Sequence, residues 1–382
     1  MKKKILFING HLNVGGVEKA LLDILNHLDY TKYEVDLLLT ETMGDLSNQL
    51  PNQVNVLFHS IEGAYGFLPY VIAKCILKRD WFCLKMRVIF LIMKIFGQKW
   101  IVLGKQLLSQ KKEYDCVIGF RPGLCTQIAA YAINAKQRIT WWHHGEVTVK
   151  QKEYLEVANR CNKVIVVSES CREMITNHFP LLREKMVTVN NMIDVNTINQ
   201  KADECNPYLE KELIHIVSVG RLDPVKHFDN AIYAAKQLKQ TGVRFKWHLV
   251  GDGELFKELR EKALKLDVND CFIFEGNQVN PYPYIKNADL FVHPSYVESF
   301  GIVVIEALVL KVPCVVTRSI GVMDFLVDGK NALITEQSPK SLTEKVIEVL
   351  KNPILYEELK KNATCPQKFK SEWVIKKIDD LM

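Results

Sequence analysis

The chain has 382 residues, of which 48% are hydrophobic and 25% charged, the composition of an ordinary soluble globular protein. This composition excludes collagen-like, wholly disordered and disulfide-scaffold proteins, and at about 150 residues per domain the length predicts two or three domains. The net charge of +6 is concentrated in residues 64–112, which hold ten lysines or arginines and one acid, so we expect no nucleic-acid partner.

Apolar segments alternate with amphipathic segments through the first half of the chain. A short apolar run at residues 4–8 is followed by a loop that contains Gly15 and Gly16, and then by a helical pattern at residues 17–28. Strands that alternate with helices predict a parallel sheet covered on both faces. Further strands are expected at residues 35–39, 115–119, 138–142 and 163–167.

The same alternation begins again near Leu213. The polar stretch at residues 196–212 separates the two series and contains Pro207, so it predicts a linker. The fold class is therefore α/β, with two parallel-sheet units of similar size. Such sheets bind ligands beyond the carboxyl ends of their strands, so the loops after strands are where chemistry is expected. In the second series, strands are expected at residues 214–219, 246–250, 271–274, 290–292 and 314–317, and helices at 229–238, 256–266, 303–310 and 339–350.

The cysteines and the absence of long apolar runs point to the cytoplasm. The ten cysteines form no C-x-x-C pair, and some, such as Cys116 and Cys314, lie in apolar runs, so we expect reduced, buried thiols and no metal site. The apolar run near the N-terminus ends at Asn9, which is too short for a signal peptide. No stretch approaches the roughly 18 apolar residues of a membrane span.

The loop after the expected strand 214–219 carries two cations. Gly220 ends the strand, and Arg221 and Lys226 follow it. An arginine can donate to two phosphate oxygens at once, and a lysine adds a point charge, so the pair suits a diphosphate. The alternative is two solvated charges near the start of a helix, and spacing alone does not choose between them.

The stretch after the expected strand 290–292 carries two glutamates. Ser299 is expected to cap a helix whose first N–H groups would favour an anion or sugar hydroxyls, and Gly301 would allow a ligand close to the backbone. Glu306 falls in an otherwise apolar helix, where a carboxylate needs a partner such as a diol. The alternatives are that Glu306 pairs with a neighbouring cation and that Glu298 is merely exposed.

Together these motifs resemble glycosyltransferase family 4, from Ile5 to the terminal helix. The family's GT-B fold implies two Rossmann-like domains that face each other across a cleft. Residues 1–195 would bind the acceptor, 196–212 would be the linker, 213–365 would bind the nucleotide sugar, and helix 366–382 would pack back onto the first domain. The matching residues are Gly220-Arg221-Leu222 with Lys226, Glu298-Ser299-Phe300-Gly301 with Glu306, Gly15-Gly16-Val17-Glu18, Asn191-Met192-Ile193-Asp194 and Gly251-Asp252-Gly253.

The resemblance implies roles for these residues. Arg221 and Lys226 would hold the donor diphosphate and stabilise it as the leaving group, so that no divalent metal or other cofactor is expected. Glu298 would contact the donor sugar, and Glu306 would bind the ribose hydroxyls. The expected donor-binding residues are Gly16, Gly220, Arg221, Lys226, Asn277, Val279, Glu298, Ser299, Phe300, Gly301, Ile302 and Glu306, and the expected catalytic residues are His144, Glu298, Arg221 and Lys226.

Two histidines follow the expected strand 138–142. In the family a histidine at the end of this strand faces the donor sugar and the acceptor, and His144 is preferred to His143 because it directly precedes Gly145. The alternative is that one histidine packs in the core and the other binds a backbone carbonyl. The resemblance implies retention of configuration without a covalent nucleophile, so no such residue is assigned.

The sequence also departs from the family pattern. His227 stands where a glycine is usual, and Ile320-Gly321 stands where a pair of glycines is common. Asp324 replaces a glutamate, and Ala332 replaces another glycine. These departures concern the donor sugar, not the phosphate cations or the two glutamates.

The basic segment 64–112 predicts contact with an anionic membrane surface. Within it, the helical periodicity puts Val88, Leu91, Ile92, Ile95 and Phe96 on one face, and aromatic residues flank the helix. A basic amphipathic helix of this kind suits a membrane surface. The alternative is a helix packed on the sheet with a solvated basic face.

These expectations combine into one hypothesis. The protein is expected to be a cytoplasmic, peripherally membrane-bound, retaining hexosyltransferase-type enzyme. It would transfer a sugar from a nucleotide-diphosphate donor, on family grounds a UDP-sugar, to a lipid-linked or polysaccharide acceptor in bacterial surface glycan synthesis. The alternatives are a non-catalytic GT-B partner protein and a sugar-nucleotide epimerase. A dinucleotide oxidoreductase is disfavoured because no G-x-G-x-x-G follows the first strand.

Overall fold

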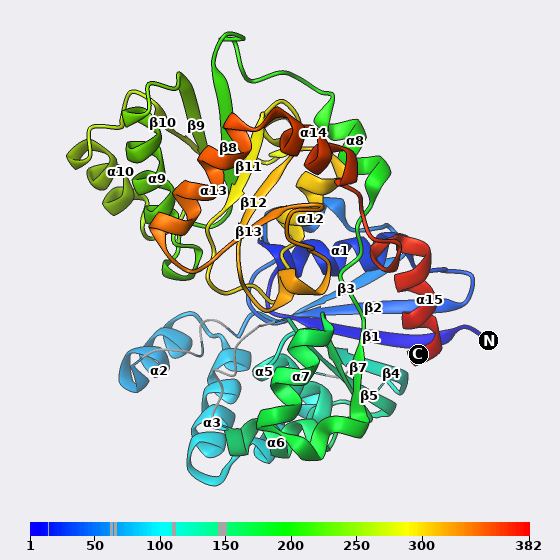
Figure 1. Cartoon of the computed structure of the whole chain (residues 1–382). Helices are drawn as coiled ribbons and strands as arrows, with labels where there is room; N and C mark the ends of the chain where they lie inside the picture. Colours follow the sequence, from blue (N-terminus) through cyan, green and yellow to red (C-terminus); the bar gives the residue numbers. More distant parts are fainter. Residues whose placement is uncertain (14, 62–63, 65–66, 109–111, 144–150) are drawn as a thin grey trace. The chain divides into compact units, whose positions relative to one another are not determined.

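The computed structural model describes residues 1–13, 15–61, 64, 67–108, 112–143 and 151–382. The chain divides into two compact units. Unit 1 comprises Met1–Met192 and Ser371–Met382, and unit 2 comprises Ile193–Lys370. Each unit is built on one parallel sheet with helices packed against it (Figure 1).

The described part of unit 1 contains a seven-stranded sheet in the order β3-β2-β1-β4-β5-β6-β7. All five strands expected from the sequence are present, and the edge strands β3 and β7 are additional. The strands are β1 (Lys3–Asn9), β2 (Tyr33–Leu39), β3 (Val54–Phe58), β4 (Tyr114–Gly119), β5 (Ala135–Trp142), β6 (Lys163–Val166) and β7 (Met186–Thr188). The helices are α1 (Gly16–His27), α2 (Leu68–Leu77), α3 (Trp81–Phe96), α4 (Lys105–Leu108), α5 (Leu124–Gln127), α6 (Gln151–Asn159), α7 (Glu169–His178) and α15 (Ser371–Leu381).

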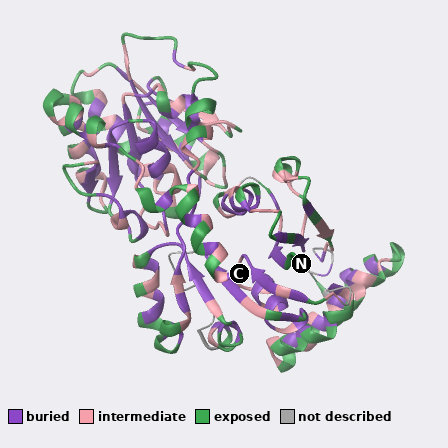
Figure 2. Ribbon diagram, turned by 90° about the vertical axis from the view of Figure 1, so that its right-hand side faces the viewer, coloured by how far each residue is buried: buried purple, intermediate pink, exposed green. Residues whose placement is uncertain are grey.

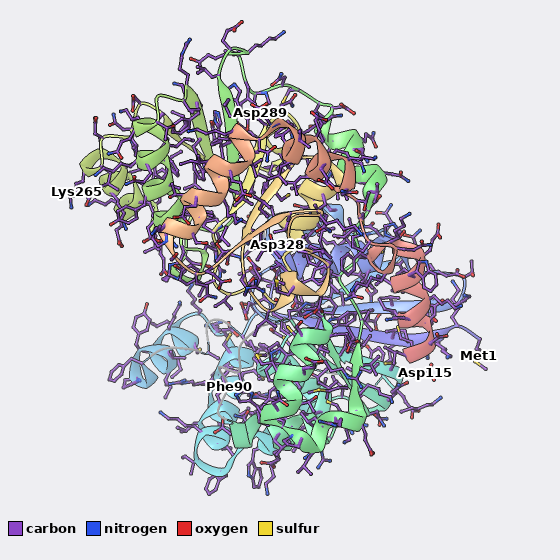
Figure 3. The ribbon with its side chains drawn as sticks, in the orientation of Figure 1. Met1, Phe90, Asp115, Lys265, Asp289 and Asp328 are labelled. Carbon is purple, nitrogen blue, oxygen red and sulfur yellow. The ribbon has the colours of Figure 1, made fainter. Side chains whose placement is uncertain are left out.

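The central strands of this sheet are buried on both faces. Figure 2 shows the strands of both sheets mainly in the colour of buried residues. This burial explains the continuous apolar run at the start of the chain, since a strand covered on both sides has no polar face. Asp115, labelled in Figure 3, fastens neighbouring strands, because its carboxylate accepts from the Lys4 N–H over 2.9 Å and from Lys136 Nζ over 2.7 Å.

The last helix, α15, packs on unit 1. Its Val374 and Ile378 side chains are 1% exposed. Lys3 Nζ donates to the Met382 carbonyl over 3.2 Å, and Gln137 Nε2 donates to the Leu381 carbonyl over 2.8 Å. The C-terminal end of the chain therefore completes the unit that the N-terminal end begins.

Unit 2 contains a six-stranded sheet in the order β10-β9-β8-β11-β12-β13. The chain starts at β8, builds outward through β9 and β10, and then returns to the other side of β8 with β11. The loops after β8 and β11 therefore diverge at a topological switch point, where open α/β sheets bind ligands. The strands are β8 (Ile214–Val219), β9 (Phe245–Val250), β10 (Phe272–Gly276), β11 (Leu290–His293), β12 (Cys314–Thr317) and β13 (Leu333–Thr335). The helices are α8 (Val195–Ala202), α9 (Phe228–Gln240), α10 (Phe256–Lys265), α11 (Tyr282–Lys286), α12 (Ile302–Val309), α13 (Pro339–Lys351) and α14 (Pro353–Asn362).

Part of the polar stretch 196–212 is helical. Asp194 caps α8 by accepting from the backbone N–H groups of Asn196 and Thr197. After this helix, the Lys286 ammonium forms an ion pair with Asp203 within unit 2. The polar composition of the stretch thus reflects a surface helix and charged contacts, and not only an irregular connection.

Candidate functional site

The loop after β8 holds a cation at the surface. Gly220 ends the strand, and the Arg221 side chain is 77% exposed. Its Nη2 lies 2.6 Å from Oδ2 of the buried Asp223, and its Nε donates to the same oxygen over 2.7 Å. Asp223 therefore orients the guanidinium and leaves the other N–H donors of Arg221 available to an anion. No sequence motif indicated this role of Asp223.

Lys226 and Glu298 form an ion pair across the switch point. Lys226 ends a short 3₁₀ turn, η6 (Pro224–Lys226), and Glu298 lies in the loop after β11. The two side chains are 19% and 11% exposed. His293, the fully buried last residue of β11, donates from Nε2 to Glu298 Oε1 over 2.7 Å. Lys226 and His293 thus converge on the same carboxylate oxygen.

This arrangement keeps Glu298 ionised. Burial alone would raise the pKa of the Glu298 carboxyl, but the positive charge of Lys226 and the hydrogen bond from His293 outweigh it and lower the pKa to about 2. An ionised carboxylate accepts hydrogen bonds and cannot donate them. Glu298 is therefore suited to accept hydrogen bonds from hydroxyl groups at neutral pH.

The loops after β8 and β11 are fastened to each other. The Tyr296 N–H donates to the Val225 carbonyl over 3.1 Å, and the Ser295 hydroxyl donates to the same oxygen over 3.2 Å. His227 has a φ of 48°, a left-handed conformation that glycine adopts most readily. Its ring stacks on Tyr296 with the centroids 3.7 Å apart. The histidine that replaces the family's usual glycine therefore keeps a left-handed backbone and adds a ring contact.

Two glycines after β9 allow the strand ends to approach closely. A Cβ atom on Gly251, whose φ is 140°, would lie 2.0 Å from the Gly220 carbonyl oxygen. A Cβ atom on Gly253 would lie 2.5 Å from the Leu222 carbonyl oxygen. The Leu222 N–H in turn donates to the Asp252 carbonyl over 3.0 Å. The sequence Gly251-Asp252-Gly253 is thus required to pack this loop against the one that carries Arg221.

The start of α12 differs from the expectation. Ser299 was expected to cap the helix, but the N-cap is Gly301, which has a φ of 78° and no side chain to cap with. The prediction was wrong because tertiary contacts fix the preceding loop: the Gly321 N–H donates to the Glu298 carbonyl over 2.8 Å, and a Cβ atom on Gly321 would lie 2.2 Å from the Ser299 carbonyl carbon. The helix begins at Ile302 as a consequence.

Phe300 contributes its backbone to this loop and its side chain to the core. The Phe300 ring is 2% exposed and packs edge-on against Phe369 with the centroids 4.8 Å apart. Ile302, the first residue of α12, is half-buried. Any ligand contact from Phe300 must therefore come from its main chain.

Asn277 and Val279, two of the expected donor-binding residues, precede α11 in the chain, and Glu306 follows it. Glu306 is 4% exposed on α12, and its Oε1 accepts from the Tyr282 hydroxyl over 3.2 Å. One partner of Glu306 is thus a hydroxyl group on α11. Asn277 and Val279 are both exposed on the loop between β10 and α11, with Val279 88% exposed.

In unit 1, the end of β1 carries a second cluster of polar side chains. Gly16 begins α1, and the buried Glu18 of the same helix forms an ion pair with Arg121, which follows β4. His11 lies between the two, with Nδ1 3.7 Å from Glu18 and Nε2 3.5 Å from Arg121 Nη1. Glu18 belongs to the motif Gly15-Gly16-Val17-Glu18, whereas no motif predicted that Arg121 would reach it.

Of the two histidines after β5, only His143 lies among the described residues. His143 is 6% exposed and packs against Phe120 and Trp141, with its ring nearly parallel to the indole at 4° and 5.8 Å. This agrees with a packed core histidine. His144 and the following Gly145 lie outside the described residues.

In comparisons with known proteins, both halves of the chain match glycosyltransferase family models. Residues 14–197 match the family model for Glycosyltransferase Family 4, and residues 201–364 match the model for glycosyl transferases group 1. Poly(ribitol-phosphate) alpha-N-acetylglucosaminyltransferase of Staphylococcus aureus is 27% identical over 241 residues, which are 61% of this chain but only 46% of that protein. The chain thus spans about half the length of this relative.

Other relatives and solved structures match over more of their length. The capsular polysaccharide biosynthesis glycosyltransferase CapM of Staphylococcus aureus is 27% identical over 73% of this chain and 79% of its own. An uncharacterized glycosyltransferase of Haemophilus influenzae is 25% identical over 93% and 92%. Anabaena Alr3699/HepE in complex with UDP-glucose is 19% identical, covers 99% of this chain and 98% of its own, and has a TM-score of 0.69. TarM is 15% identical, covers 100% and 99%, and has a TM-score of 0.73.

Proposed function

The chain belongs to the family 4 glycosyltransferases of the GT-B fold, and we propose that it transfers a hexose-type sugar from a UDP-sugar to a hydroxyl group of a glycan acceptor, with retention of configuration. In this reaction the bond between the anomeric carbon and the diphosphate oxygen breaks. A bond from the acceptor oxygen to the anomeric carbon forms, and the proton of the acceptor hydroxyl passes to the departing diphosphate. The observation that carries the proposal is that Arg221 and the Lys226–Glu298 ion pair lie in the loops after β8 and β11, at the switch point of unit 2.

Arg221 and Lys226 would act on the leaving group. Negative charge develops on the diphosphate as its bond to the sugar breaks, and cations held in place beforehand stabilise that charge without reorganisation. Asp223 holds the Arg221 guanidinium, and Glu298 holds the Lys226 ammonium. Lysine has three N–H donors, so Lys226 can contact Glu298 and still donate to phosphate oxygens. We assign no divalent metal or other cofactor a part in this step.

The remaining contacts would orient the donor. Glu298 would accept from the donor sugar, Glu306 from the ribose, and the backbone N–H groups of Phe300, Gly301 and Ile302 would bind sugar or phosphate oxygens. We also propose that Gly16 contacts the donor and that His144 faces the donor sugar and the acceptor. The rest of the proposed donor site consists of Gly220, Ser299, Asn277 and Val279.

The names of two relatives support a proposal for the acceptor class. One transfers N-acetylglucosamine to poly(ribitol phosphate), and another acts in capsular polysaccharide biosynthesis, as their names state. We therefore propose a bacterial surface glycan or its lipid-linked precursor as the acceptor. A UDP-sugar donor is supported by Alr3699/HepE, which was solved with UDP-glucose.

We further propose that the enzyme works at the cytoplasmic face of a membrane through the α2–α3 segment, residues 67–103. Among the described residues no helix is both long and apolar enough to cross a bilayer. In the α2–α3 segment, however, Asp80 is the lone acid and caps α3. Large apolar side chains are exposed throughout it, namely Phe67, Tyr70, Ile76, Leu77, Trp81, Val88, Leu91, Ile95, Phe96, Trp100, Val102 and Leu103. The same segment also exposes six basic residues, Lys74, Lys78, Arg79, Lys85, Lys94 and Lys99.

The helix α3 has two apolar faces, and only one of them is used in packing. Its buried residues are Cys83, Met86, Ile89 and Met93, and Phe90, labelled in Figure 3, lies partly buried beside the same core. The face expected to be apolar from the sequence is the outer one, where Ile95 is 64% exposed. An exposed apolar face flanked by lysines is the composition that binds an anionic lipid surface.

The transfer proposal is tested by donor binding and turnover. We expect UDP and one UDP-sugar to raise the melting temperature of the protein, and Arg221→Ala to weaken this binding by about tenfold or more, because it removes a charged donor. Arg260→Ala, which removes an exposed arginine of α10, is the matched control and should bind as the parent does. Binding of a donor without turnover on any glycan would favour the non-catalytic alternative. Failure of every nucleotide sugar to bind would contradict the proposal.

A further inference from the structure

The fully buried His293 donates a hydrogen bond to a carboxylate that the proposed function places against the donor sugar. We infer that His293 is a positioning residue, which fixes Glu298 so that Oε1 is held by the protein and Oε2 is presented to a hydroxyl of the donor sugar. This inference rests on the proposed function of the same site. It adds a residue that none of the motifs identified.

The two carboxylate oxygens of Glu298 have different surroundings. Oε1 receives both the Lys226 ammonium and the His293 N–H. Among the described residues none donates a hydrogen bond to Oε2, and Glu298 keeps 11% of its side chain exposed. The protein therefore saturates one oxygen and leaves the other to accept from outside. A sugar hydroxyl meets that requirement, whereas a phosphate would be repelled by the carboxylate.

The hydrogen bonds determine the tautomer of His293. Because ionised Glu298 only accepts, the proton between the two groups is on Nε2 of the histidine. Nδ1 is buried and has no partner among the described residues. A second N–H at that position would bury an unpaired, charged donor, which costs more than an unpaired lone pair. The tautomer that satisfies these contacts has its proton on Nε2 and none on Nδ1.

His293 is better fixed than the other donor to Glu298. It ends β11, where it is paired with Val316 of β12, and its ring is nearly parallel to that of Phe291 at 11° and 6.2 Å. The Lys226 ammonium, in contrast, is at the end of a long flexible side chain and is itself proposed to donate to the diphosphate. When the donor binds, His293 is thus the contact that keeps the carboxylate in place.

The test compares UDP, which lacks the sugar, with the UDP-sugar that binds. In His293→Leu we expect the Kd for UDP to stay within about twofold, while the additional affinity contributed by the sugar falls and kcat/KM drops by about tenfold or more. His293→Gln keeps an N–H donor at a similar reach and should recover most of both. A His293→Leu variant with unchanged sugar affinity and turnover would overturn the inference. So would a loss of UDP binding that His293→Gln does not restore, because it would show a purely structural role.

A second measurement needs no activity. Nitrogen-15 NMR of the histidine side chains should show His293 with its proton on Nε2, hydrogen-bonded, and with a bare Nδ1. Glu298→Gln should shift this Nε2–H signal, whereas Glu275→Gln, which removes the carboxylate beside His248 instead, should leave it in place. A proton on Nδ1 would contradict the inference even if UDP-sugars bind. If no nucleotide sugar binds the parent protein while this signal is present, the proposed function is wrong and the assigned role of His293 falls with it.

Discussion

At the scale of single residues, the site is organised by charges that neutralise one another before any ligand arrives. Asp223 pairs with Arg221, and Glu298 pairs with Lys226. Pairing of this kind keeps the cations in place and compensates the two largely covered carboxylates, whose unpaired charges would be costly. The ion pair of Lys226 with Glu298 also makes the stability of unit 2 depend on pH.

We expect Glu298 to stabilise the folded protein at neutral pH and to lose this effect in acid. Its pKa is lowered from 4.5 to about 2, so the stabilisation is fully present above about pH 4.5 and is lost as the pH falls toward 2. Glu298→Gln should lower the free energy of unfolding by about 1–3 kcal/mol at pH 7, the range for a hydrogen bond to a charged group. Urea unfolding at pH 7 and at pH 3 measures this difference. A difference between parent and variant that does not shrink in acid would contradict the assignment.

At the scale of helices and strands, sequence periodicity located the elements but could not assign their faces. The five expected strands of unit 1 and those of unit 2 were found because buried parallel strands are continuously apolar. In α3 the pattern contains two apolar rows, and only tertiary packing decides that Met86 and Met93 face the core while Val88 and Ile95 face outward. The start of α12 was missed for the same reason, because contacts from Gly321 act on it from a distant part of the chain.

In the candidate site, too, some residues were predicted from the sequence and others were found only through their contacts in the structure. Arg221, Lys226 and Glu298 were expected to act together because their motifs resemble those of the family 4 glycosyltransferases and because loops after parallel strands bind ligands. His293 and Asp223 were missed, because their importance comes from contacts that spacing does not encode. A histidine at the end of an apolar strand, just before a motif glutamate, is the signal that would have indicated His293.

The α2–α3 segment gives a prediction at this scale. We expect the protein to float with vesicles of phosphatidylglycerol and phosphatidylcholine, but not with phosphatidylcholine alone, and to dissociate as salt is raised. Each basic residue near an anionic surface contributes about 1 kcal/mol, so Lys85→Glu with Lys94→Glu should strongly reduce flotation.

A matched pair of variants tests the apolar contribution of the same segment. Trp81→Ser with Ile95→Ser should reduce flotation and leave turnover on a water-soluble acceptor unchanged. Leu264→Ser with Ile354→Ser removes side chains that are 60% and 82% exposed on unit 2, and should float as the parent does. Equal flotation of both pairs would show that the segment does not bind lipid through its apolar face.

At the scale of the whole molecule, the chain crosses from unit 1 to unit 2 and returns for its last helix. Unit 1 is therefore completed only by residues that follow all of unit 2. We expect Ile378→Ala, which truncates a 1% exposed side chain of α15, to lower the stability of unit 1 by about 2–5 kcal/mol. In native-state hydrogen exchange, amides of β1 and β2 should then lose protection while those of β8 and β9 keep theirs, because the two units have separate cores. Trp373→Ala, at a 50% exposed position of the same helix, is the control and should change neither set. A uniform loss of protection in both units would show instead that the two units unfold as one cooperative body.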